Sequence, residues 1–267
     1  MEYNKIYNID CLIGMKEIPD NSIDLTVTSP PYDNLRTYKG YSFDFEGIAM
    51  ELYRVTKDGG IVVWVVGDET KSFCETLSSF KQAIYFVENC HFNLLDTMIY
   101  KKKSYAPAYP HIMRYASVFE YMFIFSKGKP KTFNELRENK LKNSIGGNVV
   151  SSFRQKDGSF IKKSTNRNKK DKSRTNVWEY LTGSHAGEDK EKFKHPASFP
   201  NKLAEDHIKT WSNEHDIILD PMCGSGTTLK MAKMLNRRFI GFDISQDYVN
   251  IANKRVANVP EKLEEWI

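Results

Sequence analysis

The sequence predicts an α/β fold with a mostly parallel sheet covered by helices on both faces. Three observations support this prediction: short β-branched runs bounded by turn residues, helical patterns between several of them, and a glycine-rich turn directly after one run. With 267 residues and 40% hydrophobic content, the chain is long enough for one α/β core and an additional lobe.

The apolar runs define the expected strands, and the helical patterns between them define the crossover helices. Residues 95–101 and 118–125 have no clear helix between them, so we expect these two runs to pair as an antiparallel hairpin. The predicted strands are 23–28, 60–66, 95–101, 118–125, 217–219 and 238–242. The predicted helices are 46–56, 227–235 and 247–256.

A basic segment interrupts this alternation. Residues 127–174 contain fifteen Lys or Arg against four Asp or Glu, although the net charge of the whole chain is only +5. A basic lobe on an otherwise acidic core suits a nucleic-acid backbone, because cations near phosphates release condensed counterions. A solvated or disordered insertion is the alternative, and the two interpretations agree if the lobe orders on DNA. We expect Trp178 to anchor this lobe to the core.

Composition excludes several other classes of protein. The longest apolar run, 61–66, is far too short to cross a membrane, and the N-terminus has no apolar stretch. The four cysteines lack metal-binding or disulfide-framework spacing, so neither a zinc site nor a secreted scaffold is expected. We therefore expect a cytoplasmic protein with no membrane partner and no metal.

The glycine-rich turn lies in residues 217–228, which predict a buried strand, a turn and a helix start. Glycines let the backbone approach a ligand closely, and the N–H groups of a helix start can receive a carboxylate. Asp220, at the strand end, suits a cationic ligand better than a pyrophosphate. A tight strand-to-helix turn with only a structural role is the alternative.

A second acidic residue supports a nucleoside cofactor. Asp243 closes the next strand, seventeen residues beyond Gly226, where it would accept hydrogen bonds from ribose hydroxyls. Capping of a helix near Ser245 is the alternative role. The P-loop and dinucleotide patterns fit less well, because no Gly-Lys pair occurs at the required spacing and Leu229 occupies the third-glycine position.

The segment Thr28-Ser-Pro-Pro-Tyr32 follows the first predicted strand. Its two prolines hold the backbone extended and leave carbonyl groups free to accept hydrogen bonds. Such a segment suits methylation of the exocyclic amino group of cytosine or adenine. This nitrogen is a poor nucleophile because its lone pair is delocalised into the ring of the base. Hydrogen bonds to the Ser29 hydroxyl and the Pro30 carbonyl would favour a pyramidal nitrogen, and Tyr32 would stack on an extruded base.

Together, T-S-P-P-Y and D-P-M-C-G-S-G-T-T resemble the motifs of the amino-directed DNA methyltransferases (N4-cytosine or N6-adenine), in the β-type order with the catalytic tetrapeptide first. Residues 8–11 resemble the family segment whose Asp contacts the cofactor adenine. Residues 51–60 resemble the helix and turn that follow the catalytic strand, and residues 195–200 resemble the motif that encloses the methionine end of the cofactor.

The resemblance covers roughly residues 1–126 and 177–258, and the basic segment occupies the variable target-recognition region. It implies a seven-stranded, Rossmann-like methyltransferase sheet built from both chain ends, with S-adenosylmethionine as cofactor and double-stranded DNA as partner. The implied domains are a catalytic core of residues 1–126 and 190–267 and a target-recognition region of residues 127–189. We further expect a role in a restriction-modification system with a cognate endonuclease. A homodimer and a bacterial or phage origin with nucleoid association are also expected.

The motifs and the resemblance together predict the catalytic and cofactor-binding residues, and the charge of the basic segment predicts the DNA-binding residues. The predicted catalytic residues are Ser29, Pro30, Pro31 and Tyr32. The predicted cofactor-binding residues are Asp10, Cys11, Phe199, Asp220, Cys223, Gly224, Ser225, Gly226, Thr227, Thr228 and Asp243. The predicted DNA-binding residues are Lys162, Lys163, Arg167, Lys169 and Lys170.

The tetrapeptide also bears on the target base. In the resembled family, Ser-Pro-Pro-Tyr is typical of cytosine N4 methylation, whereas Asp or Asn in the first position is usual for adenine N6. Adenine is the alternative, because both bases present a similar amino edge. Cytosine C5 methylation needs a cysteine nucleophile, normally in a Pro-Cys pair, and the chain contains no such pair. RNA or protein amide methylation and a catalytically idle DNA-binding protein are the remaining alternatives.

Overall fold

The computed structural model describes residues 1–31, 43–103, 113–139, 148–166, 171–182 and 199–260. The chain forms two compact units: unit 1 comprises Met1–Asn134 and Asn176–Ile267, and unit 2 comprises Glu135–Thr175. Unit 2 ends at Thr175, and the chain rejoins unit 1 before the short strand β12 (Val177–Tyr180). The target-recognition region of residues 127–189 stays a prediction.

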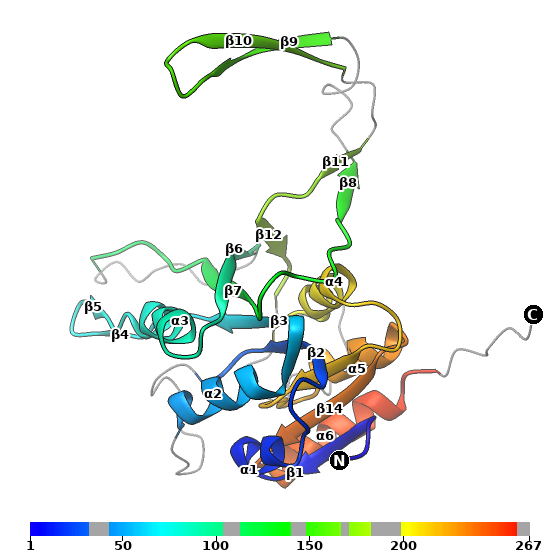
Figure 1. The fold of residues 1–267 in the computed structure, drawn as a ribbon. Helices are drawn as coiled ribbons and strands as arrows, with labels where there is room; N and C mark the ends of the chain where they lie inside the picture. Colours follow the sequence, from blue (N-terminus) through cyan, green and yellow to red (C-terminus); the bar gives the residue numbers. More distant parts are fainter. Residues whose placement is uncertain (32–42, 104–112, 140–147, 167–170, 183–198, 261–267) are drawn as a thin grey trace, which may run out of the picture. The chain divides into compact units, whose positions relative to one another are not determined.

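Unit 1 contains an eight-stranded sheet in the order β1-β14-β13-β2-β3-β7-β6-β12 (Figure 1). Only β7 runs antiparallel to its neighbours, β3 and β6, which confirms the mostly parallel sheet and the predicted hairpin. The strands of this sheet are β1 (Lys5–Asn8), β2 (Ile23–Thr28), β3 (Thr56–Val66), β6 (Asn93–Lys102), β7 (Phe119–Ser126), β12 (Val177–Tyr180), β13 (Ile217–Asp220) and β14 (Arg238–Asp243).

The predicted number of seven strands is wrong by one. The edge strands β1 and β12 have four residues each and were not predicted, because both include polar, exposed residues and lack the continuous buried apolar run that identifies the equally short β13. Trp178 lies in β12, is only 5% exposed and packs against His207, with ring centroids 4.7 Å apart and the ring planes tilted by 35°. It is a core residue of unit 1.

Six helices occur in the described residues, and none is long and apolar enough to cross a membrane. The predicted helices correspond to α2, α5 and α6 within two residues at each end, whereas α1, α3 and α4 were not predicted. In α3, Phe80 and Ile84 are apolar but exposed, so its apolar residues do not define a single face. The helices are α1 (Cys11–Lys16), α2 (Phe45–Val55), α3 (Ser78–Glu88), α4 (Asn201–Trp211), α5 (Thr227–Met234) and α6 (Gln246–Ala257).

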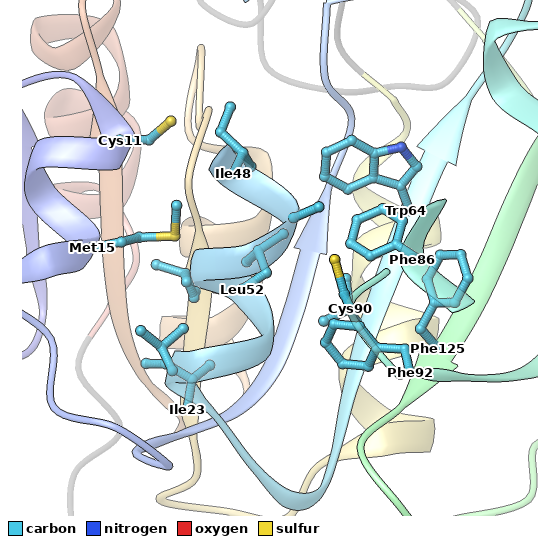
Figure 2. Close-up of a cluster of buried hydrophobic side chains, with 14 of the residues drawn as sticks. Cys11, Met15, Ile23, Ile48, Leu52, Trp64, Phe86, Cys90, Phe92 and Phe125 are labelled. Atoms are coloured by element: carbon cyan, nitrogen blue, oxygen red, sulfur yellow. The ribbon is translucent and has the colours of Figure 1, made fainter. Parts of the chain in front are cut away.

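The core lies on both faces of the sheet. One face packs against α1, α2 and α3, where Phe86 lies against Trp64 and Phe125 with ring centroids 5.1 and 4.6 Å apart (Figure 2). On the other face, α4 contacts β2 and α5 contacts β13. Alternate residues of β3 serve the two faces, and the whole run from Ile61 to Val66 is buried, as expected for a central strand of a covered sheet.

The order of the strands creates a switch point between β2 and β13. From β2 the chain continues through α2 to β3 on one side, and from β13 it continues through α5 to β14 on the other side (Figure 1). Open α/β sheets bind ligands outside the carboxyl ends of strands at such a point. The two residues at these ends are Thr28 and Asp220.

Three short antiparallel ladders complete the described structure. In unit 1, β4 (Thr70–Lys71) pairs with β5 (Cys74–Glu75). In unit 2, β8 (Arg137–Asn139) pairs with β11 (Asp171–Ser173), and β9 (Asn148–Arg154) pairs with β10 (Phe160–Asn166).

Candidate active site at the switch point

Hydrogen bonds lock the two sequence motifs together at the switch point. The Thr28 hydroxyl donates to Asp220 Oδ1 at 2.8 Å, and both residues are buried. The Thr228 hydroxyl donates to the carbonyl oxygen of Val27 at 2.9 Å. The start of the Ser-Pro-Pro segment is therefore held beside the glycine-rich turn.

Asp220 provides an unusual electrostatic environment. Burial raises its pKa to about 7, although hydrogen bonds from the Thr28 hydroxyl and the Met222 N–H oppose the shift. In the described part of the chain, no Lys, Arg or His forms an ion pair with this carboxylate. A buried carboxylate in this state is stabilised by a cationic ligand, because the positive charge replaces the lost solvation.

Asp243 joins the glycine-rich turn to the segment before α6. Its Oδ2 accepts a hydrogen bond from Gly224 N at 2.9 Å, and its Oδ1 accepts one from Ser245 N at 2.8 Å. Burial raises the pKa of this carboxyl as well. An ionised carboxylate offers about four acceptor positions, so these two bonds leave capacity for ligand hydroxyl groups.

The parallel pairing of β1 with β14 brings residues 8–11 to the carboxyl ends of the sheet strands, where Asp220 and Asp243 also lie. Asn8 pairs with Asp243 in the parallel ladder between β1 and β14. Asp10 lies two residues beyond Asn8 and caps α1 by accepting a hydrogen bond from Leu12 N at 2.8 Å. Burial, with contributions from the carboxylates of Asp10 and Asp243, raises the pKa of the Cys11 thiol to about 12.

The glycine-rich turn is shaped by packing within the protein. Gly226 has φ +74°, and an added Cβ would lie 2.7 Å from the Cβ of Ala252 on α6. The N–H of Cys223 donates to the carbonyl of Phe242 at 2.9 Å, while burial raises the pKa of the Cys223 thiol well above its usual range. Because a thiolate is the nucleophilic form, neither Cys223 nor Cys11 is suited to nucleophilic catalysis.

A buried arginine that the sequence analysis missed supports this turn. Arg255 of α6 is 2% exposed and donates through Nη1 to the Ser225 carbonyl, to the Ser225 hydroxyl at 3.1 Å and to the Thr227 hydroxyl at 3.2 Å. Its Nη2 donates to Asn201 Oδ1, at the start of α4, at 3.2 Å. The buried face of α6 consists of Val249, Ala252, Arg255 and Val256. An arginine on an otherwise apolar helix face is the sequence signal that could have identified Arg255 as a buried residue.

The remaining predicted site residues are placed as follows. Ser29 is half-buried and Pro30 is buried directly after β2, and Pro31 is half-buried beside them. Phe199 is half-buried before Pro200, the residue that precedes α4. Lys162 and Lys163 are exposed on β10 of unit 2. Tyr32, Arg167, Lys169, Lys170 and residues 195–198 of the upstream motif lie outside the described residues. Within the described ranges, no group of His, Cys, Asp and Glu is arranged to hold a metal ion.

Comparisons with known proteins agree with this geometry. A family model described as DNA methylase, for N6- and N4-directed methyltransferases, matches residues 23–254. The chain is 55% identical over 248 residues to the orphan methyltransferase M.BamHII of Bacillus amyloliquefaciens, covering 91% of this chain and 92% of that protein. It is 29% identical over 276 residues to the type II methyltransferase M.BglII of Bacillus subtilis, covering 97% and 70%.

Solved structures share the fold. The cytosine-N4-specific PvuII DNA methyltransferase superposes with a TM-score of 0.69 at 20% identity, covering 98% of this chain and 87% of that one. The complex of M1.HpyAVI with SAM superposes with a TM-score of 0.63 at 24% identity, covering 94% and 98%. Because the family model spans most of the chain, the protein belongs to the N6/N4 DNA methylase family.

Proposed function

We propose that this protein transfers a methyl group from S-adenosylmethionine to N4 of a cytosine extruded from duplex DNA. The observation that carries the proposal is the hydrogen bond between Thr28 and Asp220. It holds the segment that would receive an amino group beside the acidic, glycine-rich turn that would receive a cationic methyl donor. Family membership supports methylation of DNA, and the tetrapeptide supports the choice of base.

The residues at the switch point fit this cofactor. Asp220 is a buried carboxylate with a raised pKa, and it would hold the cationic amino-acid end. Asp243 has acceptor capacity left for the ribose hydroxyls, and Asp10 would contact the adenine. Ser225, Thr227 and Thr228 are buried and keep the turn in position through their hydroxyl groups. When bound, the cofactor supplies an activated methyl group on a sulfonium.

The tetrapeptide would prepare the acceptor nitrogen. The Ser29 hydroxyl and the Pro30 carbonyl would accept hydrogen bonds from the two amino hydrogens, which favours a pyramidal nitrogen with its lone pair directed at the donor. Pro31 keeps the backbone extended, and Tyr32 would stack on the extruded base. Loss of the amino proton after transfer makes a strong general base unnecessary.

The choice of cytosine depends on Ser29. A serine hydroxyl both donates and accepts hydrogen bonds, so it can accept one from the cytosine amino group and donate one to the neighbouring ring nitrogen N3. M.BglII is described as a type II methyltransferase and M.BamHII as an orphan, so a partner nuclease is not included in the proposal. A homodimer stays a prediction that sedimentation of the purified protein checks.

The proposal is tested by expression in a bacterium without DNA methylation, followed by single-molecule sequencing. We expect N4-methylcytosine at one sequence context, lost in Tyr32→Ala and reduced in Ser29→Ala. Adenine marks would overturn the choice of base and keep the reaction. Labelled methyl transfer to RNA or protein, with none to DNA, would overturn the substrate class.

A further inference from the structure

The hairpin of β9 and β10 is an extended two-stranded ribbon in unit 2 (Figure 1). Its register pairs Asn148 with Asn166 at one end and Arg154 with Phe160 at the other. At the turn, Gly158 N donates to the carbonyl of Gln155, and Gly158 has φ +87°. A tight turn of this kind keeps the two strands in a fixed register.

The register separates the side chains onto two faces, since directly paired residues point to the same side. One face, here called the basic face, carries two cations and two hydroxyl groups together with apolar residues. The other face, here called the opposite face, carries one lysine, a serine and an apolar cross-strand pair. The basic face consists of Val150, Ser152, Arg154, Phe160, Lys162 and Ser164. The opposite face consists of Ser151, Phe153, Ile161 and Lys163.

No described residue neutralises the cations of the basic face. In the described part of unit 2, neither Arg154 nor Lys162 forms an ion pair. The one acidic residue of the hairpin, Asp157, lies in the turn and accepts hydrogen bonds from Ser159. Lys163, on the opposite face, lies over the Phe153 ring at 5.9 Å.

The neighbouring ladder of unit 2 behaves differently. Arg137 pairs with Glu135 and, at 3.1 Å, with Asp171, while Lys172 pairs with Glu138 at 2.9 Å. Glu135, Glu138 and Asp171 therefore neutralise the cations of β8 and β11, whereas the strands β9 and β10 contain cations and no acidic residue. An uncompensated basic ribbon is complementary to a polyanion.

The polyanion that fits this ribbon is B-form DNA. Its major groove is about 12 Å wide and admits a two-stranded β-ribbon, whereas the major groove of A-form RNA is too narrow for side-chain readout. A ribbon of seven residues per strand extends roughly 23 Å at about 3.3 Å per residue, enough to follow several base pairs. An isolated two-stranded hairpin is marginally stable in water, so docking in a groove also supplies the packing that it lacks.

We infer that the basic face of β9–β10 enters the major groove of the target duplex and that Arg154 and Lys162 determine sequence specificity. This inference rests on the proposed function for its substrate. Arginine and lysine donate to O6 and N7 of guanine, and serine hydroxyls bond to several base edges. Phe160 is 67% exposed beside Arg154 and offers an apolar surface for a thymine methyl group.

The first experiment compares Arg154→Gln and Lys162→Gln with Lys163→Gln, which makes the same charge change on the opposite face. After expression in the methylation-free bacterium, sequencing should show that the first two variants lose discrimination at one base pair of the site by roughly tenfold or more. Lys163→Gln should keep the wild-type site and lower only the overall affinity and its salt dependence. Unchanged melting temperatures verify folding of all three variants.

The second experiment separates this inference from the reaction itself. Dimethyl sulfate footprinting on the target duplex reports occupation of guanine N7 in the major groove, whether or not methyl transfer occurs. Wild type should protect a guanine that Arg154→Gln leaves reactive. Unchanged site preference in both basic-face variants, or N7 protection that survives in them, overturns the inference. Absence of methylation with protection intact overturns only the proposed function.

Discussion

The Thr28 hydroxyl donates a 2.8 Å hydrogen bond to Asp220, and this bond joins the ends of two adjacent parallel strands whose last residues are 192 positions apart. It is buried, so its loss is not replaced by water. The bond therefore holds the acceptor segment beside the carboxylate, and it partly opposes the rise in the pKa of Asp220 that burial causes.

Thr28→Val removes the hydroxyl at nearly constant volume. We expect a fall in the free energy of unfolding of about 1–3 kcal/mol, because a buried acceptor loses its donor. The pKa of Asp220 should rise further, since the Thr28 bond lowers it. Urea denaturation measures the first effect, and Thr28→Ser, which keeps the donor, is the control. Equal stabilities of the valine and serine variants would show that the bond has no energetic role.

Asp220→Asn should change the pH dependence of cofactor affinity. With a pKa near 7, wild-type Asp220 is protonated below neutrality, so affinity for the cationic cofactor should fall by up to about tenfold per pH unit below 7. The asparagine variant should bind weakly with a flat profile between pH 5 and 8. Calorimetric titration across this range measures the effect, and parallel profiles for the two proteins would contradict the assignment.

The same substitution should stabilise the cofactor-free protein, although it weakens cofactor binding. The folded-state pKa of Asp220 lies above its ordinary value of 3.8, so its contribution to stability is present below that value and is lost as the pH rises through 7. Asp220→Asn should therefore melt at a higher temperature than wild type at pH 8, by at least ~2 °C. The difference should shrink at pH 5. Thermal unfolding at the two pH values tests this sign.

Arg255→Met should impair cofactor binding by loosening the glycine-rich turn. The substitution leaves the oxygen atoms of Ser225, Thr227 and Asn201 without their guanidinium donor, at a cost of about 2–3 kcal/mol in stability. We expect the KM for the cofactor to rise several-fold while the KM for DNA stays near wild type. Lys254→Met, on the exposed side of the same helix, is the control. Equal increases in both KM values would indicate a general folding defect instead.

Gly226→Ala tests the packing at the turn. The new methyl group would meet the Cβ of Ala252 at 2.7 Å, in addition to the strain of φ +74°. Gly128→Ala has nearly the same backbone strain, at φ +72°, with nothing within 4 Å of the added methyl group. We expect the Gly128 variant to lose about 1–2 kcal/mol and the Gly226 variant about 1–3 kcal/mol more. Chemical denaturation of both variants isolates the packing term.

The sequence by itself determined the fold class, the central strands and the two motifs of the site. β2, β3, β13 and β14 are buried runs bounded by turn residues, and such runs have a local signature. The motifs were identified because their prolines and glycines restrict the backbone conformation and their strand-end acids supply a negative charge, all within a few residues.

Only the tertiary structure decided how these parts meet. The order of the strands, which places β13 beside β2, depends on contacts between residues far apart in the sequence. The raised pKa of Asp220 and the buried bonds of Arg255 come from desolvation by several elements at once, which no local pattern encodes. The edge strands β1 and β12 form because a neighbouring strand offers them hydrogen bonds. Each mixes polar and apolar residues, so neither has the continuous apolar run that identified the equally short β13.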